Sequence, residues 1–344
     1  MSYSDNIPSF INFYYIIFSI FSFSLNFALI YLIWVKSPSS FSTYRFLLLN
    51  TSVNETILIV FSFLLQMRII SAGESLALLP YGPLRLVSLD ISFIFYNIYN
   101  LVLVTTNMSI LVSMYYRYRL ICHGKCKNGM LVLNFAVIWI GQMIMLAAIL
   151  IPPYDFSTVI LNTESAYPSY KLLESYGRFG GFKSTKNPIY VINTTILMGL
   201  PYLMPCLVLI WRYQIFKQIN QVQTHLSEIT KKASLDLVRA LTLQAMFPMI
   251  CLVPNVVYFV LAQVRCGRVA ALSQSSHNQL QMIHMEMEFA EYVTFPTCIL
   301  PCLIDPILTI FYVAPYRNAF TLKRGTVKVV RRVSVVQSTN RTTT

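Results

Sequence analysis

Seven stretches of predominantly apolar residues follow one another along the chain, separated by more polar segments. Each is close to the roughly 20 residues that an α-helix needs to cross the hydrocarbon core of a bilayer. Within that core a helix satisfies its backbone hydrogen bonds internally, which an open strand cannot do. The pattern therefore predicts an all-α membrane protein, a seven-transmembrane helix bundle. The predicted spans cover about residues 10–34, 46–66, 91–114, 130–152, 189–213, 240–264 and 289–313.

Prolines modify the last three predicted spans. A proline inside a helix removes one backbone hydrogen bond and clashes with the preceding turn, although neighbouring helices in a bundle can supply other partners. We therefore expect the fifth span to be broken and the sixth and seventh to be kinked. The prolines are Pro201 and Pro205 in the fifth span, Pro248 and Pro254 in the sixth, and Pro296 and Pro301 in the seventh.

Basic residues are distributed unevenly between the two sides of the predicted bundle. If the N-terminus lies outside, the inner segments hold 18 Lys and Arg residues and the outer segments hold eight. Inner loops of membrane proteins are enriched in Lys and Arg, so we predict an outside N-terminus and a cytosolic C-terminus. Topology and contact with anionic membrane lipid then explain the formal net charge of +13. No nucleic-acid partner is needed to account for it.

Two predicted connections are long, the outer segment 153–188 and the inner segment 212–239. In the inner one, apolar residues recur at helical spacing, which predicts a cytosolic extension of the fifth span. The tail, residues 321–344, is basic and has no core-forming pattern, so we expect it to be disordered. Residues 1–320 then form one transmembrane domain. The apolar positions of the extension are Ile215, Ile219, Val222, Leu226 and Ile229.

Composition narrows the classes of function. The sequence is 56% apolar and 11% charged, whereas a soluble domain carries about 25% charged residues. The seven cysteines include no CxxC pair, so we predict no metal site. No catalytic motif lies in a segment long enough to fold as an aqueous domain, and we predict neither an enzyme nor a cofactor.

Four spans carry a polar residue at a similar depth. Counted at about 1.5 Å per residue from the cytosolic ends, these residues fall roughly 12–15 Å inside the inner surface. Two of them are carboxylates, which cannot both stay ionised there without a cation. We interpret them as a buried polar layer that holds a proton, water or a sodium ion; the alternative is coincidence. The four residues are Asn26, Glu55, Asn107 and Asp305.

The outer half of the bundle offers a second set of polar and aromatic residues. Asn97 and Asn100 share one face of the third span with Asn107, and such a face points into the bundle. It either walls a ligand cavity or makes hydrogen bonds between helices, and residue type favours neither. A pocket here would be apolar and aromatic with few polar groups, which suits a small or lipid-like ligand. Its predicted walls are Tyr96, Asn97, Asn100, Asn255, Tyr258, Glu291 and Tyr292.

The third span ends in Tyr116-Arg117-Tyr118. An arginine at this position either anchors the helix at the lipid headgroups or bonds a neighbouring helix through its planar donors. In the second case we expect its partner to be one of Tyr213, Tyr312 and Thr309.

Three segments carry a resemblance to a known family. They are residues 79–85 (LPYGPLR), residues 241–245 (LTLQA), and the closing segment from Asp305-Pro306 to residues 314–319 (APYRNA). Together with seven spans, they resemble nematode serpentine chemoreceptors of class delta (Srd), which are G-protein-coupled receptors, over about residues 10–320. The resemblance implies a multi-pass receptor in the plasma membrane of sensory cilia that binds a small odorant or pheromone. It also implies a heterotrimeric G protein, expected to contact Tyr116, Arg117, Tyr118, Lys231 and Lys232.

The chain departs from rhodopsin-like receptors in ways that matter for signalling. Tyr116 replaces the acid that precedes the arginine, and Thr309 holds the tyrosine position of the Asn-Pro-x-x-Tyr pattern. The usual outer disulfide is absent, because no cysteine lies at the top of the third span or in residues 153–188. With no acid beside Arg117, we expect appreciable signalling without ligand. A seven-span ligand-gated channel or transporter is the alternative, and insect-type odorant channels differ in having the N-terminus inside.

Overall fold

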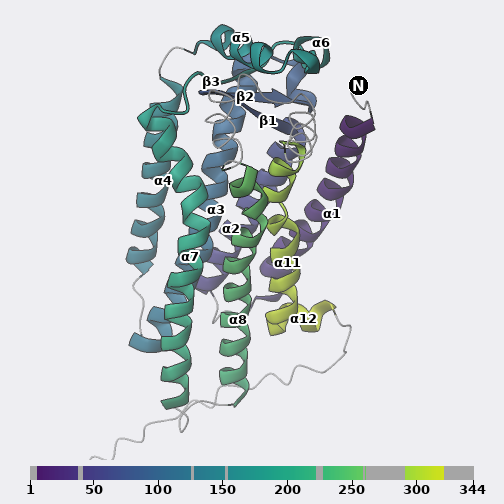
Figure 1. Cartoon of the computed structure of the whole chain (residues 1–344). Helices are drawn as coiled ribbons and strands as arrows, with labels where there is room; N and C mark the ends of the chain where they lie inside the picture. Colours follow the sequence, from purple (N-terminus) through teal and green to yellow (C-terminus); the bar gives the residue numbers. More distant parts are fainter. Residues whose placement is uncertain are drawn as a thin grey trace, which may run out of the picture.

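The computed structural model describes residues 6–37, 42–124, 128–151, 154–221, 228–258, 260 and 291–320. Seven helices in these segments are long and apolar enough to cross a membrane, and they form one bundle (Figure 1). The predicted seven-helix bundle is therefore confirmed. The candidate spans are Phe10–Lys36, Thr43–Leu65, Leu89–His123, Gly129–Leu150, Pro188–Gln221, Lys231–Tyr258 and Glu291–Tyr312.

Five of the spans are single helices, and the last two are composite. The single helices are α1 (Asn6–Lys36), α2 (Ser42–Leu65), α3 (Leu89–His123), α4 (Asn128–Leu150) and α7 (Pro188–Gln221). The sixth span begins with α8 (Glu228–Cys251) and stays helical through residues 253–258. The seventh is helical at residues 291–298 and continues as α11 (Pro301–Tyr312), which the short α12 (Ala314–Phe320) follows.

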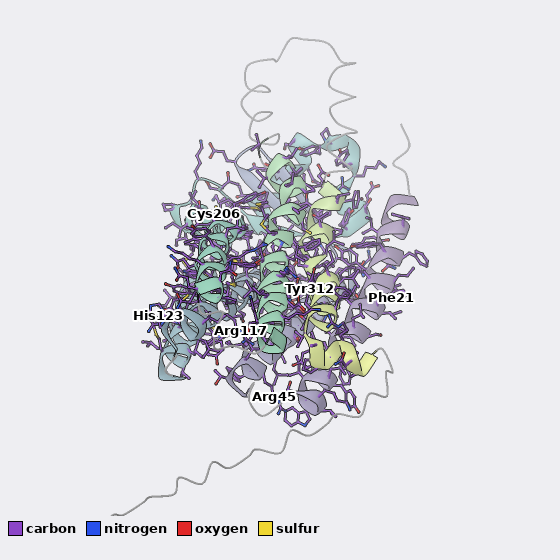
Figure 2. All side chains as sticks on the ribbon, turned by 90° about the horizontal axis from the view of Figure 1, so that it is seen from below. Phe21, Arg45, Arg117, His123, Cys206 and Tyr312 are labelled. Carbon is purple, nitrogen blue, oxygen red and sulfur yellow. The ribbon has the colours of Figure 1, made fainter. Side chains whose placement is uncertain are left out.

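The helix α3 is the centre of the bundle. It packs against α2, α4, α7 and α8 and is the most buried of the candidate spans. Its polar residues, such as Thr105 and Asn107, are buried, as expected of polar side chains in a spanning helix. In contrast, α4 exposes apolar residues such as Ile144, which suits contact with lipid. Figure 2 shows Arg117 of α3 among packed side chains and Phe21 of α1 at the edge.

One end of the bundle carries a cap that the sequence did not predict. It consists of residues 67–86 and 154–186, and its three strands form an antiparallel sheet in the order β1-β2-β3. The turn Gly73-Glu74 joins the first two strands, with Gly73 in the left-handed region at φ 62°. Two apolar runs joined by such a turn are a hairpin signal. The cap contains β1 (Met67–Ala72), β2 (Ser75–Pro80), α5 (Phe156–Ala166), α6 (Leu172–Tyr176) and β3 (Gly180–Phe182).

The segment LPYGPLR fastens the hairpin to the bundle. Tyr81 and Gly82 donate their backbone N–H groups to the carbonyls of Gln66 and Leu65 at 3.3 and 3.2 Å. A Cβ atom at Gly82 would collide with the backbone carbonyl of Leu64, so the close approach to the end of α2 requires glycine. The chain then passes through a short 3₁₀ helix, Pro83–Leu86, into α3.

The prolines act differently in the three spans. Pro201 and Pro205 lie inside α7, which continues from Pro188 to Gln221, so the predicted break in the fifth span is wrong. Inside a bilayer no water competes for the backbone, and a helix can therefore keep its remaining hydrogen bonds across a proline. In the sixth span a turn at Leu252 follows Pro248, and in the seventh a turn at residues 299–300 precedes Pro301.

The cap and the described N-terminal residues lie at the same end of the bundle (Figure 1). We call it the cap end, and the opposite end, where α12 follows α11, the α12 end. The helix α7 extends toward the α12 end, and Ile215 and Ile219 of the predicted extension are buried. Val222, Leu226 and the tail from residue 321 lie outside the described residues, and the side chain of Ile229 is also not described.

Candidate functional site

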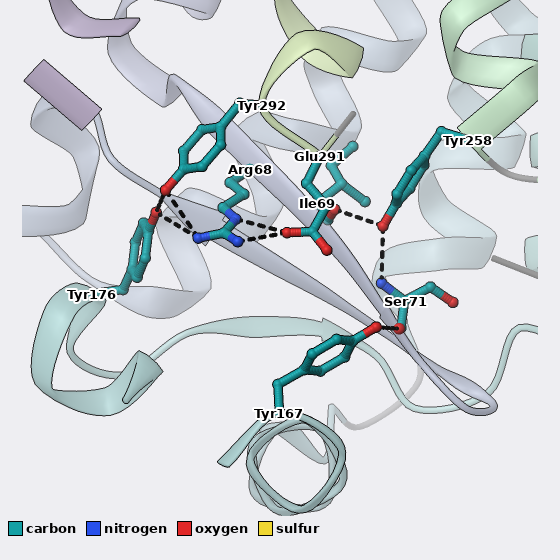
Figure 3. A network of polar contacts seen from close by, with 8 residues as sticks. All are labelled: Arg68, Ile69, Ser71, Tyr167, Tyr176, Tyr258, Glu291 and Tyr292. Carbon is teal, nitrogen blue, oxygen red and sulfur yellow. Dashed lines mark hydrogen bonds and ion pairs between the residues drawn. The ribbon is translucent and has the colours of Figure 1, made fainter. Parts of the chain in front are cut away.

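A buried ion pair joins the cap to the seventh span (Figure 3). Arg68 of β1 donates from Nε and Nη2 to Oε2 of Glu291, at 3.0 and 2.6 Å. The side chains of Arg68 and Glu291 are 1% and 0% exposed. The pair therefore connects two segments that are 223 residues apart in the sequence, and it does so away from water.

Tyrosines complete the surroundings of Arg68. Its Nη1 donates to the hydroxyl of Tyr292 at 2.9 Å and to that of Tyr176 of α6 at 3.4 Å. The two hydroxyls lie 2.9 Å apart. The guanidinium carbon is also 4.4 Å from the ring centre of Tyr292 and 5.1 Å from that of Tyr170, as in cation–π contacts. We call Arg68, Glu291, Tyr176 and Tyr292 the Arg68 network.

The sixth span is tied to the same strand. The hydroxyl of Tyr258 donates to the carbonyl of Ile69 at 2.9 Å and accepts from the N–H of Ser71 at 3.2 Å. Tyr167 of the cap donates to the carbonyl of Ser71 at 2.9 Å. Because β1 is an edge strand, its outer backbone groups need such partners. The strand therefore holds the cap, the sixth span and the seventh span together.

Burial makes the Arg68 network sensitive to the loss of one member. Each ion costs several kcal/mol to remove from water, and only good geometry with further hydrogen bonds offsets that cost. Removal of one partner of a buried pair costs about 3–5 kcal/mol, because the other charge stays buried without compensation. A movement or a ligand that separates Arg68 from Glu291 therefore has a large effect on the packing of the cap.

All seven residues predicted to wall an outer pocket are buried. Glu291 and Tyr292 belong to the Arg68 network, and Tyr258 bonds the adjacent backbone of β1. The structure thus brings these three side chains together around one strand. Sequence reasoning missed Arg68, because an arginine just past the predicted end of a span resembles an ordinary boundary residue.

The other four predicted pocket residues lie deeper in the bundle. Asn97 donates to the carbonyl of Phe93, one turn earlier in α3, at 2.8 Å. Asn255 of the sixth span donates to the sulfur of Cys298 of the seventh at 3.0 Å, which is a hydrogen bond between helices. The remaining two are the buried residues Tyr96 and Asn100 of α3.

Three of the four predicted polar-layer residues meet in the middle of the bundle. Glu55, Asn107 and Asp305 line a cavity of about 20 Å³, and Glu55 and Asp305 also line a second one of about 10 Å³. A water molecule needs roughly 10–15 Å³ of such space, so each cavity has room for about one. The structure therefore brings the buried carboxyl groups of Glu55 and Asp305 into one region, where two ionised carboxylates without a cation are unfavourable.

The fourth residue, Asn26, lines neither cavity. Its side-chain amide donates to the carbonyl of Cys302 at 2.9 Å and to that of Ser22 at 3.0 Å. It therefore fastens α1 to α11. One turn beyond Asp305, the hydroxyl of Thr309 accepts from the amide of Gln244 at 3.0 Å, which joins α11 to α8.

At the α12 end, Arg117 stacks on Tyr44 of α2. The guanidinium carbon lies 4.0 Å from the ring centre, a cation–π contact. Arg117 is only 6% exposed, whereas a headgroup anchor keeps its charge in water. The geometry therefore favours the contact between helices over the anchor.

The expected partners of Arg117 are placed differently. Tyr213 is 71% exposed, so an inward contact from it is wrong. Thr309 accepts from Gln244, and Tyr312 packs edge-on against Phe311. Tyr44 was missed because it lies just before the predicted second span and belongs to no polar motif.

The other residues predicted to contact a cytosolic partner also lie at the α12 end. Tyr118 stacks on Trp211 of α7 with ring centres 6.2 Å apart, and Tyr116 is half-buried against the core. Near the start of α8, Lys231 is half-buried and Lys232 exposed. The five residues thus share one end of the bundle, although they come from two helices.

Comparison with known proteins identifies a matching family and several relatives. Residues 11–322 match the sequence model of the family described as "Serpentine type 7TM GPCR chemoreceptor Srd". Serpentine receptor class delta-59 of Caenorhabditis elegans is 26% identical over 293 residues, which cover 85% of this chain and 83% of the relative. Class delta-40 of the same organism is 28% identical over 318 residues (89% of each chain), and class delta-51 is 24% identical over 315 residues (91% and 87%).

Proposed function

Because the chain belongs to the serpentine seven-transmembrane chemoreceptor family Srd, we propose that it binds a small odorant or pheromone and signals through a heterotrimeric G protein. Family membership and the seven apolar helices make it an integral, multi-pass membrane protein. The family match favours a receptor over a channel or transporter, and over an enzyme. A place in the plasma membrane of sensory cilia is part of the proposal.

The observation that carries the proposal is the attachment of the sixth and seventh spans to β1. Tyr258, Glu291 and Tyr292 bond this strand at the cap end, and the same two spans continue to the α12 end. A ligand that alters these bonds therefore acts on both helices at once. It shifts the balance of two arrangements only as far as it binds one of them better than the other.

We place the ligand below the cap, against the seven buried residues of the outer half. Arg68, the Tyr258 bonds and the Asn255–Cys298 bond occupy this region in the present structure. Ligand entry then requires some of these bonds to exchange. An aromatic surrounding with few polar groups suits a small or lipid-like cue.

The Asn100→Leu variant tests this placement. We expect its half-maximal activating concentration to shift about tenfold, since a lost hydrogen bond in a buried site changes binding by roughly 0.5–1.5 kcal/mol or more. The measurement is G-protein activation by a panel of small volatile and lipid-like compounds, at matched surface expression. Asn134→Leu, the same change on α4, is the control. Unchanged potency in variants of all seven positions would place the ligand elsewhere.

The cap end is the outside in this proposal. Of the described residues, the α12 end holds Arg45, Arg117, Lys231 and Lys232, among other basic residues, which agrees with the bias of cytosolic loops. The described N-terminal residues lie at the cap end (Figure 1). A receptor then meets its cue at the cap and its G protein at the α12 end.

Epitope tags inserted at Ser4 and at Thr343 test the orientation. We expect antibodies to stain intact cells only through the tag at Ser4, and both tags after the cells are permeabilised. Staining of the Thr343 tag on intact cells would contradict the receptor orientation and favour the channel alternative.

Arg117 is the proposed coupling residue. It is held by the ring of Tyr44 and has no neighbouring acid in the sequence. A neutral aromatic partner holds an arginine less strongly than a buried carboxylate does, so the residue can leave Tyr44 and meet a partner helix. Its planar donors then suit backbone carbonyls of that helix.

Substitutions at Arg117 separate coupling from anchoring. Arg117→Lys keeps the charge and loses the planar fork, while Arg117→Ala loses both. We expect both variants to lower ligand-independent nucleotide exchange on a purified G protein by about tenfold, at equal receptor density in lipid vesicles. Arg119→Lys, two residues further along α3, should leave exchange unchanged. Normal exchange by Arg117→Lys, combined with poor surface expression of Arg117→Ala, would make Arg117 an anchor only.

A further inference from the structure

A cavity lies at the cap end, beside β3. Its volume is about 460 Å³, within the roughly 300–1,000 Å³ range of small-molecule sites. It is bounded by α3, α4, α7 and the cap, and none of the seven residues of the proposed ligand site lines it. The aromatic part of its wall consists of Phe93, Tyr154, Phe182 and Tyr190.

The aromatic wall is already assembled. The ring of Phe93 lies 4.8 Å from that of Tyr154 and 5.2 Å from that of Phe182. The ring of Phe182 lies 4.9 Å from that of Tyr190. These are distances at which aromatic pairs stabilise one another, and Phe93 and Tyr190 are buried. An apolar guest therefore meets a preformed surface and need not order it.

Part of the cavity wall comes from two helices that also expose apolar side chains. Ala148 and Ile149 of α4 and Ile189 of α7 line the cavity. Nearby residues of the two helices, Ile144 and Ile192, are exposed apolar side chains. The side of the cavity that α4 and α7 form is therefore next to apolar surface of the bundle.

An exposed ion pair lies at the rim of the cavity and determines which polar group a ligand can place there. Lys183 donates to Oδ2 of Asp155 at 2.9 Å, and the two side chains are 61% and 42% exposed. Asp155 also caps α5 by accepting from the N–H and the hydroxyl of Thr158. These hydrogen bonds from Thr158 and Lys183 lower the pKa of Asp155 to about 2, so it is ionised at neutral pH.

The ion pair at the rim can bind a hydrogen-bond acceptor of a ligand more readily than a hydrogen-bond donor. Both oxygens of Asp155 are occupied. An ammonium group has three N–H donors, and among the described residues Lys183 uses one of them for Asp155. A carboxylate can therefore be added at Lys183 without displacing Asp155, whereas an amine would have to compete for Asp155.

We propose that this cavity binds a small amphipathic carboxylate, with its apolar chain among the aromatic rings and its head group on Lys183. The site goes beyond the proposed function and is tested by binding alone, whether or not the receptor activates a G protein. Two contacts connect the lining of this cavity to the rest of the molecule. Asn97 bonds the backbone of Phe93, and β3 is joined through β2 to the strand that carries Arg68.

Binding of radiolabelled decanoate to the full-length receptor in phosphatidylcholine nanodiscs tests the proposal, with empty nanodiscs to subtract partition into lipid. We expect saturable binding of the labelled decanoate. Unlabelled decanoate and decanol should displace it, and decylamine should displace it much less effectively. Ala148→Phe fills the cavity and should weaken binding by about tenfold or more. Lys183→Met should weaken the binding of decanoate by about two- to fivefold, as expected for an exposed ion contact. It should leave displacement by decanol unchanged.

Lys186→Met is the matched control, because Lys186 is also an exposed cap lysine in an ion pair, with Glu74, but does not line the cavity. It should bind decanoate like the unmodified protein. Thermal unfolding identifies a variant that fails to fold, and Lys183→Met, at the surface, keeps the test valid if Ala148→Phe does not fold. The proposal is overturned if saturable binding is absent, or if Ala148→Phe and Lys183→Met, both folded, bind decanoate as tightly as Lys186→Met.

Discussion

The burial of Arg68 opposite Glu291 is the constraint on which the cap end depends. A guanidinium and a carboxylate with almost no exposure are tolerated only when their hydrogen bonds are satisfied, because each has lost its hydration. The positions of Tyr176 and Tyr292, whose hydroxyls accept from Arg68, follow from that requirement. The ion pair therefore places β1, α6 and the start of the seventh span relative to one another.

Polar contacts of the sixth and seventh spans extend from the cap toward the α12 end. Near the cap, Tyr258 bonds the backbone of β1 and Glu291 bonds the side chain of Arg68 in the same strand. Below them Asn255 bonds Cys298, and further on Gln244 bonds Thr309. Turns near prolines already interrupt both spans, so these contacts are separate points along them. In the proposed function, a rearrangement of the uppermost contact alters the packing of the ones below and so couples the two ends of the bundle.

The sequence predicted those parts of the molecule that depend on a periodic pattern. Seven spans follow from the length of apolar stretches, and the meeting of Glu55, Asn107 and Asp305 follows from helical rise alone. The cap was beyond that reasoning, since a short hairpin between two spans has too few residues for an apolar pattern to be distinctive. The turn Gly73-Glu74 was the available signal.

The contact partner of a buried charged residue was less predictable from the sequence than the depth of a polar residue in the membrane. The role of Arg68 depends on Glu291, which is 223 residues away, and that of Arg117 depends on Tyr44 of another helix. Residue type indicates that a buried charge needs a partner, but only tertiary packing selects which one. For the same reason the continuous helix α7 differs from the expected break at Pro201 and Pro205, because its neighbours decide whether a proline bends a spanning helix.

Ligand-independent nucleotide exchange by a purified G protein, measured with the Arg68→Met/Glu291→Met double variant in lipid vesicles, decides whether the buried pair governs signalling. Apolar replacement of both ions avoids an uncompensated charge, so the protein should stay folded. We predict that exchange rises by about two- to thirtyfold, in line with coupling energies of roughly 0.5–2 kcal/mol. The Glu74→Met/Lys186→Met variant, which removes an exposed ion pair of the cap, should leave it unchanged. Exchange equal to that of the unmodified receptor in a folded double variant would show that the pair only stabilises the cap.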